Sequence, residues 1–142
     1  MTKTSQKLFD LCREYGVRDL YVFGSRTEEI SAMVRTLPLS QPPTDADVDI
    51  GILPEPSIHW NTDKKVNLTI ELEDLFHAGR VDLVLLPEAD PFLSADLIAG
   101  ELLYTKDPDQ QARYELFVLR RAGDLLPFKK ARTRMILEEG GR

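Results

Sequence analysis

The sequence predicts one α+β domain, residues 1–105, followed by a helical tail, residues 106–142. Patterns typical of helices and strands alternate along the first part without internal repeats. A chain of 142 residues, 42% of them apolar, is long enough for one domain with a core and too short for two ordinary ones. The charge changes sign at the boundary. Residues 1–105 contain nine Lys and Arg against eighteen Asp and Glu, whereas the tail contains nine against six.

The predicted domain begins with a helix, a strand and a second helix. Apolar residues between Leu8 and Tyr15 recur at helical spacing, and Gly16 is placed to end that helix. Residues 17–23 are rich in β-forming side chains and predict a strand. A helix is expected over residues 27–35, and the prolines that follow it predict an irregular loop up to Thr44.

Three further strands and two helices complete the predicted domain. Residues 47–53 predict a strand with one apolar face, because apolar and acidic side chains alternate. A helix with Thr62 as its N-cap is expected next. The last expected elements are a buried strand at residues 81–86, a helix at 92–99 and a short strand at 101–105.

The tail is expected to be helical from Asp109, with a break at Gly123 where Asp124 caps a second helix. It is not expected to add to the core of the domain. Its apolar residues include Leu116, Phe117, Leu125, Leu126, Phe128, Met135 and Ile136. Two uses remain open for them: packing on the domain, or a surface for a partner or a second copy of the chain.

Asp45, Asp47 and Asp49 occupy alternate positions, where like charges on one strand face repel. A solvated face would explain one or two carboxylates, but three favour proton uptake or a bound cation. The spacing excludes an EF-hand calcium loop. With Asp45 as position one, Ile50 stands at the glycine position and Pro56 at the glutamate position. A divalent metal site is therefore favoured, and its oxygen-only ligands indicate Mg²⁺ or Mn²⁺.

The sequence Gly24-Ser25 follows the first strand and precedes a helix. Glycine lets the backbone approach a ligand closely, and a hydroxyl just before a helix N-terminus favours anions. Magnesium held by few carboxylates usually has substrate phosphates in its shell. The turn therefore predicts a small phosphate cradle, which differs from a Walker P-loop because the sequence has no Gly-x-x-x-x-Gly-Lys-Ser or -Thr motif.

The motifs YVFGSR, DADVDIGI and RVDLVLL, in this order, resemble those of the minimal nucleotidyltransferase family of the DNA polymerase β-type superfamily. The likeness covers roughly residues 5–105 and implies a nucleotidyltransferase fold, a mixed β-sheet flanked by helices. It implies catalytic and metal-binding roles for Asp47, Asp49 and Asp82. It implies binding of nucleotide phosphates by Gly24, Ser25 and Arg26, and it makes Asp45 a bystander.

These roles correspond to nucleotidyl transfer. A hydroxyl attacks the α-phosphate in line and pyrophosphate leaves, so the site must neutralise the entering and departing oxygens. Two ions about 3.5–4 Å apart do this in two-metal sites. Asp82 is then placed to ligate the ion on the nucleophile side and to help deprotonate the hydroxyl. The prediction is an enzyme that uses two Mg²⁺ or Mn²⁺ ions and takes ATP as substrate.

The sequence departs from the family pattern between Gly24 and Asp47, a step of 23 positions. The family usually has a second arginine and a glycine soon after the turn, and neither has a clear counterpart here. Arg35 is not expected to replace that arginine. The insertion puts activity in question but leaves every candidate metal ligand in place.

The resemblance also implies a partner, because minimal nucleotidyltransferases are commonly paired as antitoxins with HEPN-domain toxins, which are small helical RNases. The predicted reaction is transfer of AMP to a hydroxyl of that protein. The alternative is a catalytically weak or inactive module that neutralises the partner by contact. A transferase for small molecules would need a further substrate-binding domain. The tail is the expected surface for a hetero-oligomer or a homodimer.

Composition argues against several other classes of protein. A domain of net charge −9 is poorly suited to nucleic acid, whose phosphates require clustered Lys and Arg. The sequence has no apolar run of membrane-spanning length and no leader pattern in its first ten residues, so a cytoplasmic protein is expected. Cys12, the single cysteine, cannot form an internal disulfide.

Overall fold

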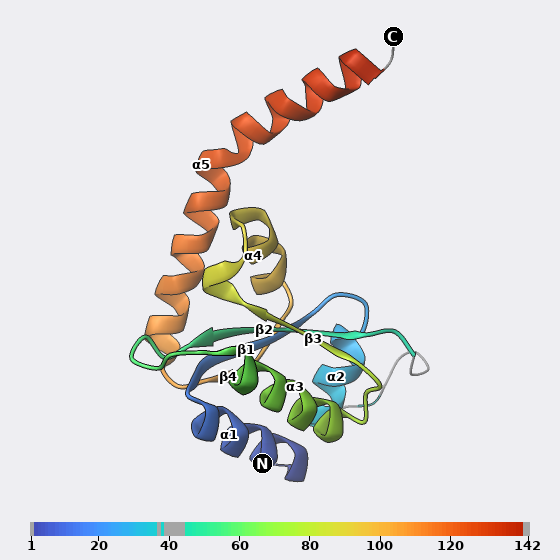
Figure 1. The fold of residues 1–142 in the computed structure, drawn as a ribbon, viewed down its shortest axis with the longest axis vertical. Helices are drawn as coiled ribbons and strands as arrows, with labels where there is room; N and C mark the ends of the chain where they lie inside the picture. Colours follow the sequence, from blue (N-terminus) through green and yellow to red (C-terminus); the bar gives the residue numbers. More distant parts are fainter. Residues whose placement is uncertain (1, 37, 39–44, 141–142) are drawn as a thin grey trace.

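The computed structural model describes residues 2–36, 38 and 45–140 (Figure 1). It confirms the predicted α+β domain with a mixed sheet and a C-terminal helix. The elements in chain order are α1 Lys3–Tyr15, β1 Val17–Phe23, α2 Thr27–Arg35, β2 Val48–Pro54, α3 Thr62–Phe76, β3 Val81–Leu85, the 3₁₀ helix η1 Leu86–Glu88, α4 Pro91–Ile98, β4 Glu101–Thr105 and α5 Pro108–Gly140.

The sheet has the strand order β3-β2-β1-β4. β1 is antiparallel to both of its neighbours, β2 and β4, whereas β2 and β3 are parallel and joined by the crossover helix α3. Figure 1 shows α1, α2 and α3 on one side of the sheet, with α4 and the first half of α5 on the other. The two central strands therefore lie between helices.

Each face of the sheet has its own apolar cluster. Leu8 and Cys12 of α1 and Leu72 of α3 pack on the first face against Ile50 and other buried residues of β2. The second cluster consists of Tyr21, Leu53, Leu86, Leu97, Ile98 and Val118. The alternating pattern of β2 predicted only the first of these faces, because it could not show that α4 covers the other one.

Gly51 is the residue that lets α4 lie against β2. A Cβ atom at this position would run into the side chain of Leu97, which α4 places directly over the strand. Past Asp49, the outward positions of β2 are therefore buried under α4, and the row of carboxylates ends at that residue.

Several predicted boundaries change slightly. α2 has the predicted bounds, but β2 begins at Val48, so Asp45 and Asp47 precede the strand. The N-cap of α3 is Asn61 rather than the predicted Thr62, because the Asn61 side chain accepts a hydrogen bond from the Lys64 N–H. Most of the predicted proline-rich loop, residues 37 and 39–44, lies outside the described residues.

The predicted break in the tail is wrong, since α5 continues through Gly123 and Pro127. A proline inside a helix meets the carbonyl four residues earlier, here that of Gly123, and bends the helix instead of ending it. The two halves of α5 run in different directions (Figure 1).

The tail also contributes to the core, against the prediction. Val118 is buried in the second cluster, and the hydroxyl of Tyr21 in β1 donates a hydrogen bond of 2.8 Å to Glu115 of α5. Within the described part of the chain, neither α5 nor any other helix has the length and apolar character needed to cross a membrane.

Candidate active site

The two parallel strands bring the predicted carboxylates together. Asp49 of β2 and Asp82 of β3 are register partners, so their side chains leave the sheet side by side. Asp47 directly precedes β2. The side chains of Asp47 and Asp82 are 46% and 41% exposed, whereas Asp49 is half-buried. The sheet thus gathers three acidic residues from two segments of the chain.

Arg80 lies between two of these carboxylates. Its Nε atom is 3.2 Å from Oδ1 of Asp82 and 3.7 Å from Oδ2 of Asp47. Sequence reasoning missed this residue. The available signal was its position two residues before Asp82, which places both side chains on the same face at the start of β3. With a side chain 69% exposed, Arg80 is free to move when another cation approaches.

The electrostatics of the site centre on Asp49. Burial raises the pKa of its carboxyl, and the negative charges of Asp82 and Asp47 raise that pKa further. A cation bound among these groups would favour their ionised forms. An all-carboxylate ligand set matches the chemistry of Mg²⁺ and Mn²⁺. Among the described residues, no three acidic, His or Cys side chains lie close enough together to form a metal-ligand set. Arg80 pairs with both Asp47 and Asp82.

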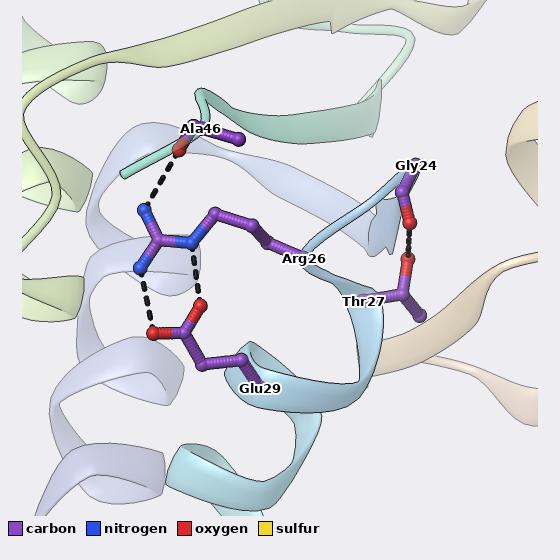
Figure 2. Close-up of polar contacts among 5 residues, drawn as sticks. All are labelled: Gly24, Arg26, Thr27, Glu29 and Ala46. Carbon is purple, nitrogen blue, oxygen red and sulfur yellow. Dashed lines mark hydrogen bonds and ion pairs between the residues drawn. The ribbon is translucent and has the colours of Figure 1, made fainter. Parts of the chain in front are cut away.

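Gly24 lies directly against the Asp49 carboxylate. It has φ +80°, and an added Cβ atom would run into Oδ2 of Asp49. The backbone N–H and the hydroxyl of Thr27 both point to the Gly24 carbonyl, at 3.4 and 2.8 Å, which shapes the turn into α2 (Figure 2). Ser25 is exposed between these two residues. The predicted phosphate turn is therefore in contact with Asp49, one of the predicted metal ligands.

Arg26 is buried, with 6% of its surface exposed. Its Nε and Nη2 atoms donate to the two carboxylate oxygens of Glu29, at 2.5 and 2.8 Å. Nη1 donates to the carbonyl of Ala46 at 2.9 Å (Figure 2). The hydrogen bonds to Glu29 raise the pKa of Arg26. Its predicted contact with phosphate stays a prediction, since Glu29 and Ala46 already bind its guanidinium group.

Arg35, at the other end of α2, has partners away from the three candidate metal ligands. It donates to Ser31, to Glu101 and to the carbonyl of Leu102, at 2.9–3.0 Å. Arg35 thus ties α2 to β4.

The mixed sheet, the glycine turn and the carboxylates on neighbouring parallel strands define a domain of the nucleotidyltransferase type. The chain belongs to the family described as polymerase beta, nucleotidyltransferase, whose model matches residues 6–109. The membership of the DNA polymerase β-type nucleotidyltransferases predicted from the three sequence motifs is therefore confirmed. No curated protein matches the chain.

Solved structures with a similar fold include toxin–antitoxin complexes. A chain of a complex with AMP-PNP is 17% identical, with a TM-score of 0.71 over 94% of this chain and 98% of that one. A chain of a tri-AMPylated Shewanella oneidensis HEPN toxin in complex with an MNT antitoxin is 19% identical, with a TM-score of 0.61 over 98% and 97%. A chain of the MntA–HepT toxin–antitoxin structure is 18% identical, with a TM-score of 0.61 over 98% and 97%. At these identities the likeness establishes the fold.

Replacing Gly24 by Ala should disturb the site and the fold together. The positive φ costs an L-residue about 1–2 kcal/mol, and the new methyl group must displace the Asp49 carboxylate. We expect a lower midpoint of thermal unfolding and weaker Mn²⁺ binding. Gly79→Ala is the matched control, since a Cβ atom there meets nothing within 4 Å. Unchanged Mn²⁺ binding in Gly24→Ala would contradict the close contact between the turn and Asp49.

Proposed function

We propose that this chain transfers a nucleoside monophosphate, AMP from ATP, to a hydroxyl of a HEPN-domain partner protein and releases pyrophosphate. The observation that supports this most directly is the contact between the glycine turn and Asp49, whose register partner on the neighbouring parallel strand is Asp82. A triphosphate held by the turn would place its phosphates next to these carboxylates. Membership of a nucleotidyltransferase family gives the reaction class.

In this proposal Asp47, Asp49 and Asp82 hold two Mg²⁺ or Mn²⁺ ions. The bound ions would neutralise the triphosphate and the charge that develops on the entering and leaving oxygens. Asp82 accepts the proton of the attacking hydroxyl. Bound ions would replace the positive charge of Arg80 beside Asp47 and Asp82, so these two carboxylates would no longer need their ion pairs with Arg80.

The turn binds the nucleotide in this proposal. The backbone at Gly24 and Ser25 precedes the N-terminus of α2, where the helix dipole favours anions. The hydroxyl of Ser25 is exposed and adds a donor. Because residue 24 is glycine, no Cβ atom of its own stands between the backbone of the turn and the phosphate oxygens.

The partner is proposed from the similar complexes and from the surface of α5. The second half of this helix lies away from the sheet (Figure 1). Exposed large apolar side chains on α5 are Leu116, Phe117, Leu119, Leu125, Leu126, Phe128 and Met135. Helices that expose apolar side chains bind in the grooves of partner proteins. The HEPN-domain protein is proposed to cover these side chains of α5, and the chain is proposed to be cytoplasmic.

Phe128→Asp should disrupt the complex without disturbing the domain. Phe128 is 73% exposed, so a charge there costs little in the free chain but would be buried unpaired in the interface. A loss of about 10-fold or more in partner affinity is expected, since each tenfold corresponds to about 1.4 kcal/mol. Isothermal titration with the HEPN protein measures it. Val66→Asp on α3, also at an exposed apolar residue, should leave the affinity unchanged. If Phe128→Asp bound the partner as tightly as the wild type does, the partner would have to bind at a surface that does not include Phe128.

The reaction itself is tested with labelled nucleotide. The chain is incubated with Mg²⁺, the HEPN protein and ATP labelled at either the α- or the γ-phosphate. The proposal requires label on the partner from the α-labelled nucleotide alone, with release of labelled pyrophosphate from the γ-labelled one. Label from the γ-position would indicate a kinase instead.

A second function, neutralisation of the partner by contact alone, is supported by a different observation. The exposed apolar side chains of α5 lie on a different element from the carboxylates, so binding of a partner through them would need none of the carboxylates. The two functions make opposite predictions for variants of Asp82.

A further inference from the structure

We infer that Arg26 and Glu29 are positioning residues for the metal-binding carboxylates, and that they act through the backbone carbonyl of Ala46. This inference rests on the proposed function, because it concerns the metal site of the transfer reaction. It assigns a role to Glu29, and it gives Arg26 a task other than contact with phosphate.

The first support is the way in which Arg26 is bound. Its side chain and that of Glu29 are only 7% and 13% exposed. The planar guanidinium group donates two hydrogen bonds to Glu29 and one to Ala46, so three of its five N–H donors are used (Figure 2). A fork of this kind is specific to arginine, since a lysine offers only one charged nitrogen.

The second support is the place of Ala46 in the chain. It directly precedes Asp47, and Asp47 precedes β2. On the other side of Asp47, the N–H of Val48 donates to the carbonyl of Arg80 at 3.0 Å. The backbone of Asp47 is therefore fixed at both neighbouring residues: at Ala46 by Arg26 and at Val48 by the segment leading to β3. These two hydrogen bonds set where the Asp47 carboxylate leaves the backbone.

The third support is the length of chain between the partners. Arg26 and Ala46 are 20 positions apart, with α2 and the inserted segment between them. A long connection does little to position the residues that follow it. The buried arginine supplies a fixed point at the N-cap of α2, directly after the glycine turn. It therefore couples the position of the phosphate turn to that of Asp47.

A phosphate contact by Arg26 would require a different arrangement. Its two remaining N–H donors belong to a side chain that is only 7% exposed, so the guanidinium group would have to become more exposed or leave Glu29. A largely buried carboxylate without its partner is costly. A positioning role and a phosphate role also differ in what they affect. Positioning changes the affinity for the metal itself, whereas a phosphate contact changes only the affinity for nucleotide.

The test measures Mn²⁺ binding by electron paramagnetic resonance, first without nucleotide and then with AMP-PNP. The main variant is the double substitution Arg26→Leu and Glu29→Leu. Removing both members of a buried ion pair is tolerated far better than removing one. Loss of supporting contacts around a metal site typically weakens metal binding about 10- to 100-fold. We expect a loss of that size without nucleotide as well as with it, and a fall in kcat for label transfer.

Arg26→Lys is the second variant, because it keeps the charge but cannot bind Glu29 and Ala46 with the same fork. It should also weaken Mn²⁺ binding. The matched control is Arg35→Leu with Glu101→Leu, which removes another arginine pair of α2 that also donates to a backbone carbonyl. That control should bind Mn²⁺ as the wild type does. Circular dichroism confirms that each variant is folded.

Either of two results would overturn the inference. One is wild-type affinity for Mn²⁺ in Arg26→Lys or in the folded double-leucine variant. The other is an effect that appears only when AMP-PNP is present, which would show that Arg26 contacts phosphate. A wild-type chain that binds Mn²⁺ but transfers no label would refute the proposed reaction and leave this comparison valid. A wild-type chain that binds no Mn²⁺ under either condition would refute both.

Discussion

Asp49→Asn should abolish nucleotidyl transfer and at the same time raise the thermal stability of the metal-free chain. The substitution removes one charge and one ligand from the metal site, and a loss of several orders of magnitude in rate is expected, at about 1.4 kcal/mol for each tenfold. The gain in stability follows from the surroundings of the native carboxylate. Asp49 is half-buried, and Asp82 and Asp47 repel its charge.

The pH dependence of that gain has a definite sign. Because burial and the two neighbouring carboxylates raise the pKa of Asp49, the folded chain binds its proton more tightly than the unfolded chain. The stabilisation from that proton is present below the ordinary pKa of aspartate. It is lost as the pH rises through the higher folded value. The unfolding midpoint of Asp49→Asn should therefore exceed that of the wild type most at neutral and alkaline pH. The difference in midpoint should shrink in acid.

Thermal unfolding in the presence of a chelator, at several pH values, measures this effect. Asp45→Asn is the matched control, because Asp45 is exposed, lies close in sequence and has no proposed role as a ligand. It should leave both transfer and stability unchanged. A lower unfolding midpoint for Asp49→Asn at neutral pH would show that the carboxylate is stabilised in the free chain. Retained transfer would remove Asp49 from the metal site.

Asp82→Ala should separate nucleotide binding from chemistry. The variant keeps Asp47, Asp49 and the glycine turn, so binding of ATP should be largely retained. Transfer should fall by several orders of magnitude, because one residue supplies both the proton acceptor and a metal ligand. Titration with AMP-PNP and a single-turnover assay measure the two effects separately. An equal loss of binding and transfer would show that Asp82 mainly holds the nucleotide complex.

Local periodicity predicted most of the fold. The bounds of α2 and the strands that contain Asp49 and Asp82 followed from patterns within a few residues. The predictions that failed concern features that depend on contacts between distant parts of the sequence. The outward face of β2 is buried because α4 returns over Gly51. Local signals at Gly123 and Pro127 indicated a break, but α5 continues as a bent helix, with its first half anchored on β1.

In the candidate site, too, the features with local signals were predicted and those that depend on distant contacts were missed. The carboxylates and the glycine turn were predicted because their spacing is local and matches a family pattern. Glu29 was missed although its distance of three residues from Arg26 is a common ion-pair spacing on a helix. Its importance depends on Ala46, which reaches the pair only in the folded chain. Arg80 was missed because an exposed arginine at a strand end is ordinary until the fold brings Asp47 beside it.

The most direct test of the proposed reaction is the intact mass of the HEPN partner after co-expression with this chain. If the chain is an adenylyltransferase, the partner made with the wild type carries the added mass of AMP, and the partner made with Asp82→Ala is unmodified. If the partner is unmodified in both cases while both chains relieve its toxicity equally, neutralisation occurs by contact and the carboxylates take no part in it.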